Sequence, residues 1–187
     1  MNKKSFVVFI LLFFGLNMIA QTNICFHVMP DGSFQSEANE DFIVVPFEGK
    51  SAQEIYLELA TNINSIYNSP KNVMNGVEYS SIKIRAIGGL VYDKSIIGIV
   101  SILDAHYQLE FKIKDNRVRV SAPFIEESLS LKTDGLPFKE YSKVVKGYFK
   151  NGKLKEKKQK DYDFLNNQIN SIIEKVLGLD KAEDDKW

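Results

Sequence analysis

The stretch YQLEFKIKDNRVRVSA, residues 107–122, alternates apolar and polar side chains with unusual regularity. Apolar residues occupy positions 107, 109, 111 and 113, and the pattern resumes at Val118 and Val120. Between the two halves, Asp115-Asn116 can adopt the positive φ values of a tight turn. Period-two alternation is typical of a strand with one face on a core and the other face in water. The stretch therefore predicts an antiparallel hairpin, which places a sheet at the centre of the fold.

Further strands are predicted on both sides of this hairpin. Residues 81–86 alternate in the same way, and residues 96–103 form a more uniformly apolar run. Upstream, short apolar runs at residues 24–29 and 41–47 predict two more strands. Pro46 cannot donate a backbone hydrogen bond, so it places the second of these at a sheet edge or at a strand end.

Two helices are predicted, one on each side of the central strands. The first begins at a capping box, Ser51-Ala52-Gln53-Glu54, in which the serine oxygen and the glutamate carboxylate each accept a backbone N–H. It continues through an apolar stripe formed by Ile55, Leu59, Ile63 and Ile66. The second helix carries its stripe on Leu165, Ile169, Ile172, Ile173 and Val176. Gly178 follows that stripe and suits a left-handed C-cap.

The order of elements is therefore a short strand pair, a helix, several antiparallel strands and a second helix, or β-α-β(n)-α. An amphipathic antiparallel sheet buries its apolar face most simply beneath helices. The sequence thus predicts the α+β class, with an antiparallel β-sheet and two helices packed on one of its faces.

The first twenty residues, MNKKSFVVFILLFFGLNMIA, have the pattern of a secretory signal peptide. Two lysines precede an apolar run at residues 6–16, which is shorter than the roughly 20 residues of a membrane span. Cleavage is predicted between Ala20 and Gln21, which leaves no stable membrane span. We therefore expect the protein in the periplasm, at the cell surface or secreted. The alternative is an uncleaved N-terminal anchor that keeps the protein at the membrane.

Removal of residues 1–20 leaves a single predicted domain at residues 21–178 and a flexible C-terminal tail at residues 179–187. The chain of 187 residues has 24 basic and 24 acidic side chains, so no global positive charge attracts nucleic acid. Cys25 is the only cysteine, which excludes an internal disulfide. We expect Cys25 to be a small buried apolar group.

Several segments together resemble a known bacterial family. They are the capped helix after a short strand pair, the strand beginning near Tyr79, the segment Ile97-Gly98-Ile99-Val100 and the hairpin FKIKDNRVRV at residues 111–120. Over about residues 24–177 the chain is similar to the bacterial domain-of-unknown-function family 4468, described as having a TBP-like fold. The resemblance implies an exported, uncharacterised protein with that fold and no assigned activity. A TBP-like sheet can bind DNA, but a fold does not imply a function, and an exported, near-neutral protein is not expected to bind nucleic acid.

The sequence contains no recognisable catalytic, cofactor-binding or metal-binding motif. His27 and His106, the two histidines, lack the spacing of metal ligands. Cys25 and His27 would point the same way on a strand, as a Cys–His dyad requires, and Asp104 with His106 could form an acid–base pair. Neither pair has an identifiable third group. We expect no cofactor and no catalysis, and the alternative is an enzyme of unrecognised type that uses one of these pairs.

A lysine-rich segment spans residues 139–161, where aromatic residues are interleaved with the lysines. The lysines that could contact an anion or a partner are Lys139, Lys143, Lys146, Lys150, Lys153, Lys155, Lys157 and Lys158. Such a segment fits lipid headgroups, an acidic polysaccharide or an acidic envelope protein. The alternative is a solvated, mobile connector.

These patterns together predict an exported, non-catalytic binding or interaction domain of the bacterial cell envelope. It would bind its partner through the solvent-exposed face of the sheet or through the lysine-rich segment.

Overall fold

The computed structural model describes residues 24–94, 100–131 and 137–180. The predicted signal peptide, the cleavage position at Ala20 and Gln21, residues 96–99 of the predicted strand and residues 181–187 of the predicted tail lie outside these ranges.

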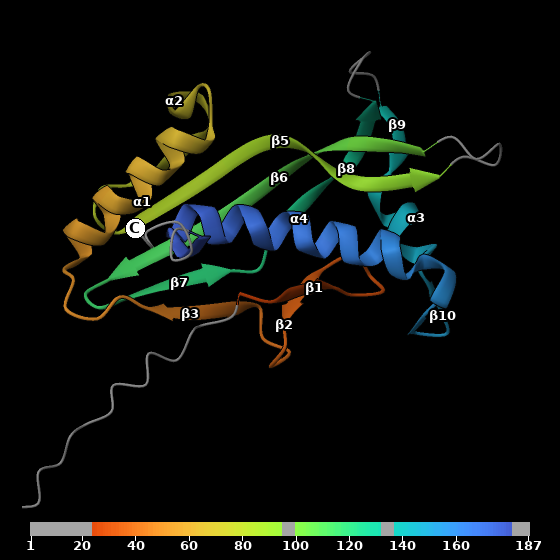
Figure 1. Cartoon of the computed structure of the whole chain (residues 1–187), viewed down its shortest axis with the longest axis horizontal. Helices are drawn as coiled ribbons and strands as arrows, with labels where there is room; N and C mark the ends of the chain where they lie inside the picture. The colour runs from red at the N-terminus through yellow and green to blue at the C-terminus, as the bar shows by residue number, and fades with distance from the viewer. Residues whose placement is uncertain (1–23, 95–99, 132–136, 181–187) are drawn as a thin grey trace, which may run out of the picture.

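One antiparallel sheet of seven strands forms the centre of the fold (Figure 1). The alternating patterns predict an antiparallel sheet, but they do not predict its strands at Met74–Val77, Phe124–Leu131 and Pro137–Glu140. Its strands are β3 (Phe42–Pro46), β4 (Met74–Val77), β5 (Ser81–Lys94), β6 (Val100–Lys114), β7 (Arg117–Ser121), β8 (Phe124–Leu131) and β9 (Pro137–Glu140). The predicted hairpin is confirmed, because Lys114 pairs with Arg117 and Asn116 has a φ of 64° in the turn. Its apolar face is buried, since Phe111 and Val120 are both fully covered.

The strand order places β3 at one edge of the sheet, as Pro46 predicts. β5 pairs with one side of β6 along nearly its whole length. β7 and β8 follow one another along the other side of β6, where β7 pairs with residues 111–114 and β8 with residues 103–108. The connection between β7 and β8 is only two residues long, Ala122 and Pro123. The two strands therefore act as one interrupted strand with a break at Pro123.

The register of β5 against β6 shifts between Gly89 and Val91. A bulge of this kind inserts one extra residue, and here Leu90 and Val91 are both buried in succession. A Cβ atom at Gly89 would come within 2.8 Å of the Ile102 Cγ2 atom. A larger residue at position 89 would therefore force the Ile102 side chain to move.

Two long helices supply the second layer, α1 (Ala52–Ile66) and α4 (Gln159–Leu177). They pack against each other, α1 also contacts β6, and α4 also contacts β5. Figure 1 shows α4 lying across the sheet. The expectation of only two helices is incomplete, because short helices occur at α2 (Pro70–Val73), α3 (Tyr141–Lys146) and the 3-10 turn η1 (Glu156–Lys158).

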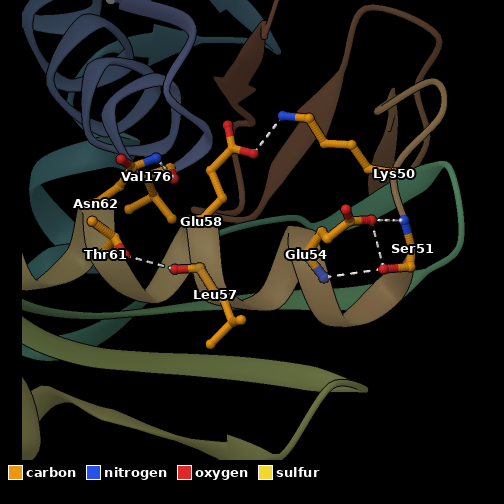
Figure 2. Close-up of polar contacts among 8 residues, drawn as sticks. All are labelled: Lys50, Ser51, Glu54, Leu57, Glu58, Thr61, Asn62 and Val176. Atoms are coloured by element: carbon orange, nitrogen blue, oxygen red, sulfur yellow. Dashed lines mark hydrogen bonds and ion pairs between the residues drawn. The ribbon is translucent and has the colours of Figure 1, made fainter.

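The N-terminus of α1 has the predicted capping box (Figure 2). The amide of Glu54 donates to the Ser51 Oγ atom at 3.3 Å, and the amide of Ser51 donates to the Glu54 carboxylate at 2.8 Å. Farther along the same helix, the buried Asn62 donates through Nδ2 to the carbonyl oxygen of Val176 at 3.0 Å. This bond ties α1 to the last turn of α4, which ends at Gly178 in the predicted left-handed conformation.

The first predicted strand forms, but it does not join the main sheet. β1 (Phe26–Val28) pairs with β2 (Phe34–Ser36) in a separate hairpin that packs against α4. The alternation of buried and half-exposed residues in β1 matches its apolar pattern. A pattern of this kind predicts a strand but not the sheet to which the strand belongs.

No helix among the residues the structure describes is long and apolar enough to cross a membrane.

Candidate functional site

The lysine-rich segment folds into a series of short elements. After β9 and α3 come a two-stranded hairpin, β10 (Phe149–Lys150) with β11 (Lys153–Leu154), then η1 and the first turns of α4. Three side chains from this part of the chain are buried in the core: Tyr141, Val145 and Tyr148. These large side chains pack the segment against the rest of the protein, whereas a solvated connector has no such buried side chains.

The β10–β11 hairpin presents lysines at its end. Asn151 and Gly152 form the turn with φ values of 51° and 74°, and Lys150 and Lys153 lie directly opposite each other. Positive φ values at both central residues are characteristic of the tight turn that matches strand twist. At the base of the hairpin, Lys155 donates through Nζ to the carbonyl oxygen of Gly147 at 2.7 Å. The turn thus fixes the backbone beneath two exposed lysines.

Of the eight predicted lysines, Lys139 lies in β9 opposite Leu129. The other seven, together with Lys160, which was not predicted to be part of the site, fall into two groups. Lys143 pairs with Glu140, Lys158 pairs with Asp161, and Lys155 is bound to the backbone. By contrast, among the residues described, no acidic partner lies within ion-pair distance of Lys146, Lys150, Lys153, Lys157 and Lys160, all of them exposed. We refer to these five residues as the lysine surface. They come from α3, the hairpin, η1 and the start of α4, so the fold gathers them around one end of α4 (Figure 1).

The two candidate catalytic pairs do not form a recognisable centre. Cys25 is half-buried rather than buried as expected, and burial together with a hydrogen bond to Glu37 raises the pKa of its thiol above 9.0. A catalytic cysteine needs the opposite shift, because the thiolate is the nucleophile. Asp104 and His106 lie on β6, opposite Gly89 and Ile87, and within the described part of the chain no hydrogen bond joins them. The same ranges contain no group of three or more potential metal ligands.

A hollow of about 650 Å³ lies against the break between β7 and β8, and we call it the edge hollow. Its lining comes from the turn between β1 and β2, the start of β3, strands β6 to β8 and the start of α3. Phe124, which is 58% exposed, is part of the lining. No motif in the sequence predicts this hollow. The signal that could have suggested it is Pro123, at which the alternating run of residues 107–122 ends.

Ion pairs and hydrogen bonds connect the charged side chains on the solvent-exposed face of the sheet, beside the edge hollow. Glu110 accepts from Ser121 Oγ at 3.2 Å and lies 3.2 Å from the Lys83 ammonium group. Partial burial raises the pKa of Glu110, but the hydrogen bond from Lys83 and the charge of Lys112 outweigh it, so the net shift is downward. Arg119 lies 4.0 Å above the ring of Phe42. The solvent-exposed face of the sheet therefore carries acidic and basic side chains close to one another rather than charges of a single sign.

The comparisons with known proteins inform the fold. No family model and no curated protein matches this chain. A DUF4468 family protein from Bacteroides ovatus ATCC 8483 superposes with a TM-score of 0.55 at 12% identity, over 78% of this chain and 87% of that one. A TBP-like protein from Parabacteroides distasonis ATCC 8503 gives a TM-score of 0.46 at 15% identity, over 73% of this chain and 86% of that one. The chain has the α+β fold of that DUF4468 structure, as the sequence resemblance implies.

Proposed function

We propose that this protein is an exported, non-catalytic binding domain of the bacterial cell envelope, and that its lysine surface binds an acidic polysaccharide. The observation that carries the proposal is the set of five exposed lysines without an acidic partner within ion-pair distance among the described residues. Export is proposed from the N-terminal pattern of positive and apolar residues. In the same proposal, residues 21–178 form one domain.

The surroundings of the lysine surface favour a polyanion over other anionic partners. The large exposed apolar side chains of the described residues lie elsewhere: Val44, Leu57, Val77, Tyr79, Ile87, Ile102, Phe124 and Leu179. A protein interface normally has an apolar or aromatic centre, and an inserted membrane contact needs apolar side chains as well. A charged polymer requires neither, because it is held by Coulomb attraction and by release of its counterions.

The rigidity of the segment also supports this proposal. Because Tyr141, Val145 and Tyr148 anchor the backbone in the core, the spacing of the lysines is maintained before a ligand arrives. Preorganised cations lose less conformational freedom on binding than cations on a disordered chain. A polymer with regularly spaced carboxylates could therefore contact several lysines at once.

A titration of the purified protein with sodium polygalacturonate tests the proposal. We expect binding that weakens steeply as salt rises from about 50 to 200 mM. Reversal of charge at the hairpin tip, with Lys150→Glu and Lys153→Glu together, should weaken binding at least about tenfold, since each lysine contributes about 1 kcal/mol against an anionic surface. The matched control reverses Lys71 and Lys114, two exposed lysines outside this segment.

Two results would contradict the proposal. If the tip variant and its control lost the same affinity for the polymer, binding would depend on the net charge of the protein and not on the lysine surface. Binding of the same strength to vesicles of anionic lipid, with none to the polymer, would identify a membrane surface instead. Export is tested separately by N-terminal sequencing of the protein from the cell envelope. A chain beginning at Gln21 is expected, and one beginning at Met1 would indicate the uncleaved anchor.

A further inference from the structure

The outer side of the interrupted strand β7–β8 is covered by two other strands that leave a gap between them. β6 occupies the inner side of both β7 and β8. On the outer side, β3 pairs with β7 as far as Ser121, and Ala122 donates its amide to the carbonyl oxygen of Asp41. β9 resumes the outer pairing only at Ser128. Within the described ranges, residues 123–127 therefore have no strand partner on their outer side.

Both neighbouring strands end at the borders of this gap. Upstream of β3, the chain turns away at Asn39, which has a φ of 60°. After β9, the chain enters α3 at Tyr141. Five positions opposite residues 123–127 are thus left open, a length of about 17 Å at 3.4 Å for each antiparallel residue. Figure 1 shows β3 and β9 far apart along the sheet, with β7 and β8 between them.

The edge hollow lies at this gap. Its lining includes Pro123, Phe124, Ile125 and Glu127 of the uncovered stretch, with Asp41, the residue before β3, and Tyr141 of α3 at the two borders. An edge strand directs N–H and C=O groups outward, and these groups form a template for another extended chain. The hollow therefore combines an open volume with an uncovered strand edge.

Acidic side chains outnumber basic ones around the gap, whose lining also includes Lys112 and Arg119. Asp31, Asp41 and Glu127 line it, and all three are exposed. Hydrogen bonds from the side chain and backbone of Ser33 lower the pKa of Asp31, so its carboxylate stays charged at neutral pH. Glu127 accepts from Ser142 Oγ at 2.7 Å, and Asp41 is 3.7 Å from Arg119. Among the described residues, neither Asp31 nor Glu127 has a basic side chain within ion-pair distance.

We propose that an extended peptide segment carrying lysine or arginine binds in this gap and adds to the outer edge of β8 as a strand. The backbone of the peptide would pair with residues 124–127, and its basic side chains would meet Asp31 and Glu127. Ile125 is buried and Phe124 is exposed, so alternate side chains of the peptide would lie toward the core and over the Phe124 ring. This site is separate from the lysine surface and carries more acidic than basic side chains.

The first test follows backbone amide signals of the isotope-labelled protein by nuclear magnetic resonance. The probe is a blocked pentapeptide of alternating valine and lysine. We expect the amide signals of Phe124, Ile125, Glu126 and Glu127 to shift, and the amides among them that point to the outer side to exchange more slowly with solvent. The same peptide with an N-methylated central valine should bind at least about tenfold more weakly, because it lacks one backbone donor and clashes at the strand edge. The glutamate counterpart should not shift these signals.

Matched variants test the role of charge. Asp31→Asn with Glu127→Gln should weaken binding of the lysine peptide several-fold, because the amides keep the shape and remove two charges. Glu48→Gln with Glu78→Gln, two exposed acids outside the gap, should leave the affinity unchanged. Neither pair should alter binding of polygalacturonate, which separates this site from the lysine surface.

Three outcomes would overturn the inference. The first is that the amide signals do not shift at millimolar peptide. The second is that the N-methylated peptide binds as tightly as the unmodified one. The third is that the two pairs of variants lose the same affinity for the lysine peptide. Shifts of the same four amides on raising the protein concentration alone would identify a second copy of this chain as the occupant.

Discussion

The side-chain amide of Asn170 pairs with both backbone groups of Phe26. The amide of Phe26 donates to Asn170 Oδ1 at 3.0 Å, and Asn170 Nδ2 donates to the carbonyl oxygen of Phe26 at 2.9 Å. One helical turn earlier, Asn166 Oδ1 accepts from the amide of Val28 at 2.9 Å. Two asparagines at i and i+4 therefore give β1 the hydrogen bonds that a neighbouring strand would provide. This arrangement connects the first strand to the last helix.

Replacement of Asn170 should destabilise the protein although the residue is only half-buried. Asn170→Ala leaves the N–H and C=O of Phe26 without their partner, which costs about 1–3 kcal/mol for a buried group. Urea unfolding measures the change. Asn167→Ala, at an exposed position on the same helix, is the control and should change stability by less than about 0.5 kcal/mol. Equal effects would mean that β1 docks through apolar packing alone.

Adjacent residues in β6 should respond very differently to the same substitution. Phe111→Asp places a carboxylate in a fully buried site between sheet and helices and should cost at least about 3 kcal/mol. Lys112→Asp lies on the exposed face, where its 3.8 Å contact with Glu110 contributes less than about 1 kcal/mol. Thermal unfolding compares the two variants. Similar losses would show that the strand register is different from the one described.

The stabilisation by Glu110 should depend on pH. Its pKa is lower in the folded protein than its ordinary value of 4.5, so folding favours the charged carboxylate. The contribution is complete above the unfolded-state pKa and is lost as the pH falls through the lower folded-state pKa. The difference in unfolding free energy between the wild type and Glu110→Gln should therefore be present at pH 7 and should shrink as the pH falls below 4.5. A difference that grows on acidification would contradict this sign.

Cys25 should react slowly with alkylating reagents. Burial, the hydrogen bond to Glu37 and the Glu37 charge all raise the pKa of its thiol, so less thiolate is present at pH 8 than in free cysteine. The rate of reaction with iodoacetamide measures this effect. Glu37→Gln should speed the reaction, whereas Glu48→Gln should not. A wild-type rate above that of free cysteine would support the alternative of a Cys25–His27 dyad.

Local structure was predictable wherever short-range chemistry decides it. The capping box at Ser51, the turn at Asn116 and the left-handed cap at Gly178 each depend on a few neighbouring residues, and all three are confirmed. The α+β class follows from alternating and helical periodicities for the same reason. The lysine-rich segment was harder to interpret, because exposed lysines mask the three buried side chains that anchor it.

The amino-acid sequence alone determined the two long helices, the central hairpin and the apolar face of each, because these properties depend on spacing along the chain. It did not predict the strands β4, β8 and β9 or the short helices. Tertiary structure decided that the backbone of β1 hydrogen-bonds to asparagine side chains of α4 and that β1 does not join the main sheet. It also decided that β3 and β9 stop short of each other beside residues 123–127. Both features join residues far apart in the sequence, and no local pattern specifies how distant segments meet in space.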